Sequence, residues 1–410
     1  MGKFPYYRAM QNIRVLWYKG VYKTARFLAS PAMSRKLHYT YDIVVPKHTP
    51  YMVFSNHTTL WDHLMIGMAI KGHMFYVAGE HLFRKKSTRL AGRCLLDPII
   101  RKKGAPAGEV IRDIKERLSA GNNVWMSPEG VRSINGETAF ISPATGKLVK
   151  ECGELGASLI TYRMHGGYLR RPRWGKTPRD GTMQGEFVHE YSPEELKGMT
   201  VDQINEAINR DLYVNTFDDQ KKNPLPYTGT DLAESLETIL YICPECKQMG
   251  RLHSKGDILS CECGYAVKFN EFGLFEPASD HPLHHDNIVS WDHWQRDLIK
   301  ERLPAYLATQ KDVPIESDEG QILGKIGAMK SVEDLGTGKF SIYVDRLEFD
   351  GDKGKFVFPF ADIEGFAFSL QMKILFSLHD GTYYEVESKI PRSASKYMVL
   401  YRFLIGKEYK

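Results

Sequence analysis

Two polar residues five positions apart, His57 and Asp62, have types and spacing that could perform acid and base chemistry. Histidine is the side chain best suited to remove a hydroxyl proton near neutral pH, and a carboxylate can fix its tautomer and stabilise the imidazolium that forms. On one continuous helix the two side chains would point about 140° apart. We therefore expect His57 in a loop and Asp62 in the first turn of the following helix. The structural alternative is a helix capping box formed by Thr59 and Asp62.

A second polar block runs from Ser127 to Ser133 and reads Ser-Pro-Glu-Gly-Val-Arg-Ser. It comes directly after Asn123 to Ser127, an apolar run of the kind that forms a strand. Open α/β sheets place their ligand sites just beyond the carboxyl ends of strands. The block therefore stands where a site residue of such a sheet is expected.

At these two blocks the chain resembles the glycerolipid acyltransferase family of the lysophosphatidic acid acyltransferase type, whose blocks read N-H-x-x-x-x-D and F-P-E-G-T-R-S. The first is intact from Asn56 to Asp62, and the second departs from the pattern at Ser127 and Val131. Between them, Leu96 to Arg101 resembles a family block that ends in a phosphate-binding arginine. The order and spacing of the blocks match over about residues 40 to 215.

The resemblance implies transfer of a fatty acyl group from a thioester donor, acyl-CoA or acyl carrier protein, to the free hydroxyl of a lysophospholipid. The foremost acceptor would be 1-acyl-glycerol-3-phosphate, which gives phosphatidic acid. His57 would be the general base and Asp62 the residue that orients it. The implied substrate-binding residues are Arg101, Glu129, Gly130 and Arg132. The two arginines would form charge-assisted hydrogen bonds to the acceptor's phosphate.

Four of the six cysteines lie in two close pairs, Cys243 with Cys246 and Cys261 with Cys263. Such pairs can surround one tetrahedral ion, and four sulfur ligands leave no open position for catalysis. We therefore predict a structural zinc ribbon over residues 236–275. The neighbouring His253 is an alternative ligand.

The order of apolar runs predicts an α/β protein with appended domains. Strands alternate with helices over residues 36–225, which indicates an acyltransferase domain with a mixed sheet flanked by helices. The zinc ribbon follows, then a helical linker over 281–315. Residues 320–410 have the pattern of a small antiparallel β domain closed by a helix, which looks like a pleckstrin-homology domain in architecture.

The first 35 residues are predicted to form a basic amphipathic helix, clearest over residues 9–30. The apolar residues of one side are Met10, Ile13, Trp17, Val21 and Leu28, and the basic residues of the other are Lys19, Lys23 and Arg26. The apolar side could pack on the protein's own core or lie in a membrane interface.

Composition limits the class of protein. The 410 residues are 42% hydrophobic and 26% charged, which suits two or three folded domains. Apolar runs are far shorter than the roughly 20 residues of a spanning helix, and no secretory signal is visible. We therefore expect a cytoplasmic protein bound peripherally to the inner face of the membrane.

Two basic stretches could bind phosphates, anionic lipid or nucleic acid. Their members are Arg84, Lys85, Lys86, Arg89, Arg93, Arg101, Lys102 and Lys103, and then Arg163, Arg170, Arg171, Arg173, Lys176 and Arg179. The alternatives to an enzyme are a noncatalytic lipid adaptor and a nucleic-acid-binding zinc-ribbon protein. The intact His57 and Asp62 argue against an adaptor. The first stretch lacks interleaved aromatic residues, so no nucleic-acid partner is expected.

Overall fold

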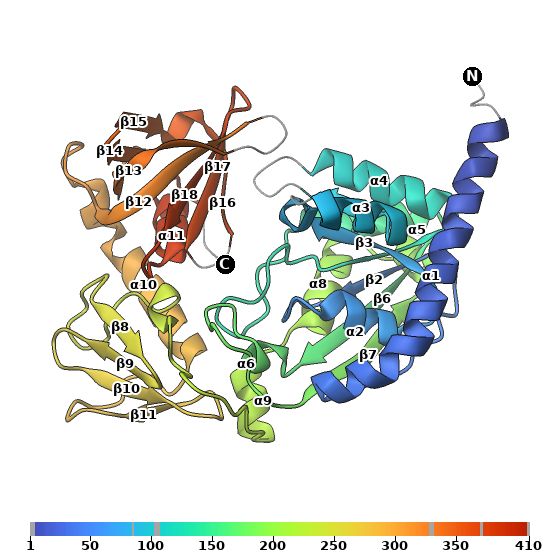
Figure 1. Ribbon diagram of the computed structural model, residues 1–410, viewed down its shortest axis with the longest axis horizontal. Helices are drawn as coiled ribbons and strands as arrows, with labels where there is room; N and C mark the ends of the chain where they lie inside the picture. The colour runs from blue at the N-terminus through green and yellow to red at the C-terminus, as the bar shows by residue number, and fades with distance from the viewer. Residues whose placement is uncertain (1–4, 84–85, 102–106, 328–331, 370–371, 408–410) are drawn as a thin grey trace.

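The computed structural model describes residues 5–83, 86–101, 107–327, 332–369 and 372–407. Of the basic residues named above, Arg84, Lys85, Lys102 and Lys103 lie outside this set. A domain with a seven-stranded sheet comes first, followed by a four-stranded sheet and then a second seven-stranded sheet. The two smaller domains lie on the same side of the first domain, at the left of Figure 1, with helix α10 between them.

The first sheet is mixed, as the sequence predicted. Its strands are ordered β1-β7-β6-β2-β5-β3-β4, and β6 with β7 is its antiparallel pair. The bounds are β1 (Tyr39–Tyr41), β2 (Tyr51–Ser55), β3 (Met74–Gly79), β4 (Ile99–Arg101), β5 (Asn123–Met126), β6 (Ser158–His165) and β7 (Met183–Tyr191). Because β2 to β6 run parallel, their carboxyl ends meet at one edge of the sheet.

Helices cover both faces of this sheet. They are α2 (Asp62–Ala69), α3 (Lys86–Leu95), α4 (Gly108–Ser119), α5 (Ala144–Glu154), α6 (Gly167–Arg170), α7 (Pro193–Gly198), α8 (Val201–Leu212) and α9 (Thr216–Lys222), with a 3-10 turn η1 (Glu80–Phe83). Strand β2 shows why two apolar layers form. Met52 and Phe54 pack with α4, α5 and α8 on one face, while Tyr51 and Val53 pack with α2 on the other. A capping box of Thr200 and Gln203 begins α8.

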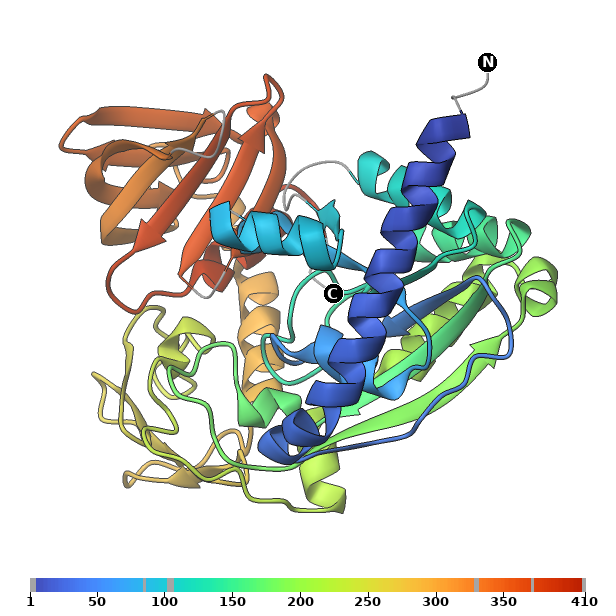
Figure 2. The ribbon, with the colours of Figure 1, turned by 45° about the vertical axis from the view of Figure 1, so that its right-hand side comes forward.

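Helix α1 (Pro5–Leu37) lies along the outside of the first domain (Figure 2). The side that faces the domain is partly polar: Tyr22 Oη donates to Gly67 O, and Arg26 Nη2 donates to Met68 O at 2.9 Å. Arg26, predicted on the side opposite the apolar residues, donates to carbonyls at the end of α2. The opposite side of α1 exposes Ile13, Leu16, Trp17, Phe27 and Leu28.

None of the helices that the structure describes combines the length and the apolarity needed to cross a bilayer.

The ribbon and the C-terminal domain are antiparallel throughout. The ribbon contains η2 (Leu236–Thr238), β8 (Leu252–Lys255), β9 (Ile258–Cys261), β10 (Ala266–Phe269) and β11 (Phe275–Pro277). After α10 (Ile288–Leu307) come β12 (Glu316–Ile326), β13 (Val332–Ile342), β14 (Arg346–Gly351), β15 (Gly354–Pro359), η4 (Phe360–Asp362), β16 (Ile363–Ser369), β17 (Lys373–Leu378), β18 (Tyr383–Ser388) and α11 (Ala394–Leu404). The predicted closing helix is present as α11. The pleckstrin-homology likeness stays a prediction.

The first domain, the ribbon and the C-terminal domain with α10 are joined by direct contacts. Trp174 of the first domain meets Phe269 of the ribbon edge to face, with ring centroids 5.6 Å apart. Tyr227, between α9 and the ribbon, is buried, and its hydroxyl donates to Thr182 O. Helix α10 reaches the segment after β5, since Asn135 Nδ2 donates to Asp292 Oδ2 at 2.8 Å.

A second contact of α10 with this segment is sensitive to pH. His293 Nε2 lies 2.7 Å from Glu137 Oε2, and Tyr213 Oη donates to the same carboxylate. The hydrogen bond to Glu137 raises the pKa of His293. For Glu137, burial favours the neutral form, but the bonds from His293 and Tyr213 lower the pKa overall. The pair is therefore fully charged between the two folded-state pKa values.

We expect His293→Gln to lower the melting temperature by about one or two degrees at pH 6, and by less at pH 9. A histidine with a raised pKa stabilises the fold fully below its ordinary value of 6.5, and this contribution is lost as the pH rises through the folded-state pKa. Thermal unfolding at both pH values measures the difference. The exposed His253→Gln is the matched control. An equal loss at both pH values would contradict the prediction.

Candidate active site

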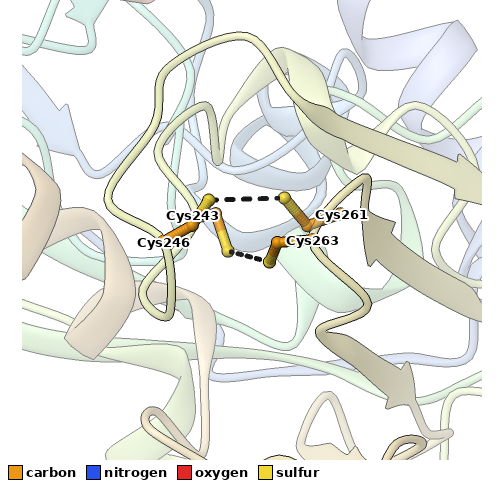
Figure 3. Close-up of side chains that lie close together, drawn as sticks. All are labelled: Cys243, Cys246, Cys261 and Cys263. Carbon is orange, nitrogen blue, oxygen red and sulfur yellow. Dashed lines mark hydrogen bonds between the residues drawn. The ribbon is translucent and has the colours of Figure 1, made fainter.

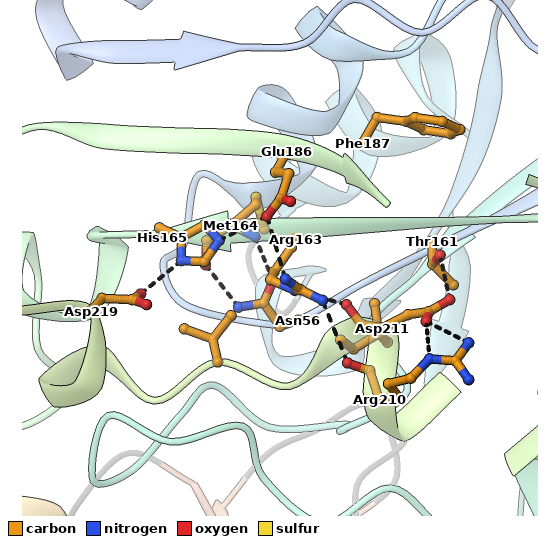
Figure 4. A network of polar contacts seen from close by, with 12 residues as sticks. Asn56, Thr161, Arg163, Met164, His165, Glu186, Phe187, Arg210, Asp211 and Asp219 are labelled. Atoms are coloured by element: carbon orange, nitrogen blue, oxygen red, sulfur yellow. Dashed lines mark hydrogen bonds and ion pairs between the residues drawn. The ribbon is translucent and has the colours of Figure 1, made fainter. Parts of the chain in front are cut away.

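The loop that carries His57 begins at the carboxyl end of β2, and its first residue is hydrogen-bonded to the neighbouring strand β6. Asn56 Nδ2 donates to Met164 O at 2.8 Å, and Met164 N donates to Asn56 Oδ1 at 2.7 Å (Figure 4). Asn56 is buried, so the amide side chain satisfies both main-chain groups of a β6 residue. The first residue of the N-H-x-x-x-x-D block therefore fixes the starting point of the loop.

His57 and Asp62 meet in the arrangement that their spacing requires. His57 lies in the loop, Asp62 is the first residue of α2, and Nδ1 lies 2.6 Å from Oδ2. The buried carboxylate also accepts hydrogen bonds from Thr58 N and Thr59 N, at 2.7 and 2.9 Å. Trp61 is the helix N-cap without a side-chain cap, so the capping-box alternative does not describe this turn. With Nδ1 bound to a carboxylate, Nε2 is the nitrogen left to accept a proton.

The second block holds the main chain of His57. Glu129 Oε1 accepts a hydrogen bond from His57 N, and Ser133 N donates to His57 O at 2.8 Å. The other oxygen of Glu129 accepts from Ala139 N. Burial raises the pKa of Glu129 to about 8, while the two backbone bonds favour its charged form. Glu129 was predicted to bind substrate, and its carboxylate instead faces the backbone of His57 and Ala139.

A cavity of about 330 Å³ opens beside the imidazole. It is lined by four of the residues predicted from the sequence, His57, Arg101, Gly130 and Arg132. Gly130 has a φ of 67°, a left-handed conformation that strains other residue types. The apolar part of the lining includes Leu60, Tyr76, Leu82, Phe83, Leu96 and Trp125. The pocket thus combines a basic group, fixed cations and an apolar wall.

The sheet explains why residues far apart in sequence meet here. His57 follows β2, Arg132 follows β5 and Arg101 ends β4, and these strands are parallel with β3 between β4 and β5. Their side chains therefore gather at the carboxyl edge, as expected for an open α/β sheet. Burial lowers the pKa of Arg101 and of Arg132, although guanidinium groups remain charged at neutral pH.

Three further lining residues, His63, Ser127 and Arg173, have polar side chains but were not predicted as site residues. His63 and Ser127 face the same cavity, and Ser127 Oγ is buried without a hydrogen-bond partner among the described residues. Arg173, from the segment after β6, also lines it. The only signal for Arg173 was its membership of a basic stretch, which does not distinguish it from its neighbours.

Other members of that stretch support the fold. Arg163 Nε donates to Asp211 O at 2.9 Å, and Arg163 also contacts Glu186 (Figure 4). In the same network His165 bonds Asp219 at 2.7 Å. Burial acts to lower the pKa of His165, but Asp219 and Glu186 outweigh it, so the pKa is raised. These charges tie β6 to β7, α8 and α9, and none of these residues lines the cavity beside His57.

The four ribbon cysteines form a second site (Figure 3). Their sulfur atoms all lie within 4.8 Å of one another, and Cys243 to Cys263 and Cys246 to Cys261 are each 3.7 Å apart. Four sulfurs at 2.3 Å from a tetrahedral ion are separated by about 3.8 Å. The spacing therefore fits a metal ion. His253 pairs with Glu262 and does not join the cysteines.

Comparisons with known proteins find a family model and solved structures to which the chain is similar. No curated protein matches the chain. A similar solved structure is that of the 1-acyl-sn-glycerophosphate acyltransferase PlsC from Thermotoga maritima, which is 18% identical, with 52% of this chain and 83% of that chain covered and a TM-score of 0.40. Another is the C-terminal domain of an unknown protein from Leishmania infantum. It is 12% identical, with 27% of this chain and 96% of that chain covered and a TM-score of 0.18.

The family model described as Acyltransferase matches residues 36–164. This range contains the loop of His57 and Asp62, the arginine that ends β4 and the whole block after β5. Over residues 36–164 the chain is therefore similar to the acyltransferase family.

Proposed function

We propose that the protein moves a fatty acyl group from a thioester donor, acyl-CoA or acyl carrier protein, to the free hydroxyl of a lysophospholipid. The proposed acceptor is 1-acyl-glycerol-3-phosphate, and the product is then phosphatidic acid. The observation that carries the proposal is the His57–Asp62 pair, which opens into a pocket with arginines on one side and an apolar wall on the other.

In the proposed reaction, His57 Nε2 accepts the proton of the acceptor hydroxyl while the oxygen attacks the thioester carbonyl carbon. Asp62 stabilises the imidazolium that forms. The tetrahedral intermediate then collapses, the carbon–sulfur bond breaks, and the imidazolium gives its proton to the leaving thiolate. The products are an ester and a free thiol, and no acyl-enzyme is needed.

The acceptor's phosphate is proposed to bind Arg101 and Arg132. Both line the pocket, and guanidinium groups match phosphate with two parallel hydrogen bonds. None of the residues described as lining the pocket is an aspartate or glutamate, so no carboxylate there repels an anionic head group. The acyl chain would extend along the apolar wall that includes Leu82 and Phe83.

We also propose that the four cysteines bind one structural zinc ion. The ribbon is small, and two cysteines, Cys243 and Cys261, are buried in a core shared with the first domain. An ion at their centre would link the turn before β8 to the turn after β9. Its part is to hold the module folded, because four sulfur ligands leave no position for a substrate.

A third proposal places the enzyme on the inner face of the cytoplasmic membrane, bound through α1. The side chains of Ile13, Leu16, Trp17, Phe27 and Leu28 are each at least 59% exposed. At 100° per residue they fall within about 120° of arc on one side of the helix. An exposed apolar stripe of this kind, next to the exposed Lys19 and Lys23, suits an anionic lipid interface.

The first test concerns the chemistry. We expect His57→Ala to lower the turnover number for acyl transfer roughly a hundredfold or more, because positioned proton transfer contributes 10² to 10⁴. Asp62→Asn keeps the shape but removes the charge, so it too should act on turnover. The assay is transfer from acyl-CoA or acyl carrier protein to 1-acyl-glycerol-3-phosphate by purified protein.

The matched control is His48→Gln. His48 lies before β2, at the opposite end of the strand, and its Nδ1 bonds Glu190 at 3.0 Å. It should keep wild-type turnover. Near-normal transfer by His57→Ala would refute the assigned base, and wild-type protein without transfer would favour a noncatalytic lipid adaptor.

The second test concerns the metal. Elemental analysis should find about one zinc per chain, and a strong chelator should lower the melting temperature because the ion links parts of a module with little core of its own. Cys246→Ser should lose the zinc, whereas Cys94→Ser, at an exposed cysteine on α3, should keep it. Metal-free protein with an unchanged melting profile would rule the proposal out.

The third test concerns the membrane. Wild-type protein should sediment with anionic liposomes, and the bound fraction should fall as salt rises, because exposed charge attraction is screened. The variant Leu16→Gln with Phe27→Gln should bind several-fold less, because it removes apolar area from the stripe. Leu307→Gln, at an exposed leucine on α10, is the control. Binding that persists in high salt and survives deletion of residues 1–30 would defeat the proposal.

A further inference from the structure

Arg173 stands at the carboxyl end of β6, on the segment that follows α6, and lines the same cavity as His57, Arg101 and Arg132. It is 6% exposed, and its Nη1 donates to Arg132 O at 3.4 Å. The guanidinium therefore lies beside the main chain of the second block. It also lies beyond residues 36–164, outside the stretch that matches the family.

The segment around Arg173 is held rigidly. The next residue, Trp174, is fully buried, and its Nε1 donates to Tyr168 Oη at 3.0 Å. Tyr168 Oη in turn donates to Ile134 O at 3.1 Å. Trp174 also packs against Phe269 of the ribbon. These contacts fix the main chain from which Arg173 projects, so its side chain is presented at a defined place.

The C-terminal domain touches the side chain directly. The guanidinium carbon of Arg173 lies 4.5 Å from the ring centroid of Phe368, a buried residue of β16. An arginine stacked on an aromatic face keeps its N–H groups in one plane, where they remain able to donate at their edges. Arg101 also interacts with this domain: burial lowers its pKa, and the phenol of Tyr383 acts in the opposite direction.

Three other basic residues of the same stretch have partners away from the cavity. Arg170 donates to Gly181 O and Lys36 O, Arg179 donates to Leu232 O, and Lys176 pairs with Glu234 at the surface. None of these three lines the cavity. Arg173 is thus the residue of this basic stretch that lines the described cavity together with His57.

We propose that Arg173, oriented by Phe368 of the C-terminal β domain, is a third guanidinium that binds the phosphate of the acceptor. A lysophospholipid with a phosphomonoester head group carries up to two negative charges, and three guanidinium groups around one pocket match that charge. The inference rests on the proposed acyl transfer and adds to it a residue that determines specificity and a role for the C-terminal domain. Phe368 acts as a positioning residue, since it reaches the pocket through Arg173.

The test compares a charged with an uncharged acceptor. Arg173→Met keeps the length of the stem and removes the charge. We expect its KM for 1-acyl-glycerol-3-phosphate to rise roughly tenfold to a hundredfold, the range for loss of a hydrogen bond to a charged group. The KM for the donor and the kcat/KM for 1-monoacylglycerol should stay as in the wild type. Arg173→Lys should recover part of the loss, and Lys176→Met should have no effect.

A double-mutant comparison tests the part of Phe368. Phe368→Leu should raise the KM for the phosphorylated acceptor severalfold, and it should add nothing in the Arg173→Met background if it acts through Arg173. Val357→Ala, at an exposed site on β15 of the same domain, controls for general damage to that domain. Additive effects of the two substitutions would overturn the positioning role.

The outcomes separate this inference from the proposed function. Wild-type protein that transfers acyl groups to neither acceptor would refute the proposed function itself. Wild-type transfer with an Arg173→Met variant that is unaffected, or equally impaired on both acceptors, would overturn only the role of Arg173. Equilibrium binding of 1-acyl-glycerol-3-phosphate, measured without donor, should weaken in Arg173→Met by the same factor as the KM rises. Unchanged binding would also overturn the proposal.

Discussion

The buried carboxylate of Glu129 is the constraint on which the rest of the site depends. One oxygen accepts from His57 N and the other from Ala139 N, so a single side chain joins the loop after β2 to the segment after β5. A buried carboxyl group without hydrogen-bond partners is costly, and the loops can therefore separate only by leaving this group unpaired. Ser133 N closes the arrangement by donating to His57 O. These bonds thus fix the main chain of His57 independently of its contact with Asp62.

With the main chain of His57 fixed in this way, the part of Asp62 is to orient the imidazole ring. Its carboxylate lies at the start of α2 and accepts hydrogen bonds from Thr58 and Thr59 as well as from His57. The aspartate is therefore ordered by its own loop before the substrate binds. A carboxylate that is already in place needs no rearrangement when positive charge develops on the imidazole, and this is how preorganised sites lower a barrier. Glu129 thus holds the backbone of His57, and Asp62 orients its imidazole.

Short-range features of the sequence predicted the parts of the fold that local physics decides. The strand that ends at Ser55, the capping box before α8 and the spacing of His57 and Asp62 could all be deduced from neighbouring residues. Features that depend on distant partners could not. The periodicity of α1 identified two sides, but Arg26 turns inward because the free carbonyls at the end of α2 need donors. Strand β12 begins with several polar residues and gains its place by pairing with β13 and β18. Glu129 stands in a family block, yet its bond to a main-chain nitrogen has no signature in sequence.

The ribbon and the C-terminal domain both contact the segment that carries Arg173 and Trp174, which forms part of the pocket wall. The turn that carries Arg173 and Trp174 has little apolar surface of its own, yet Trp174 packs on the ribbon at Phe269 and Arg173 stacks on the C-terminal domain at Phe368. Helix α10, which lies between these two domains, also bonds the segment after β5 through Asp292 and His293. Two walls of the pocket are therefore fixed from outside the acyltransferase domain. Trp174 and Phe368 are buried in these contacts. Loosening either added domain should therefore misplace the arginines of the pocket before it disturbs the sheet that carries His57.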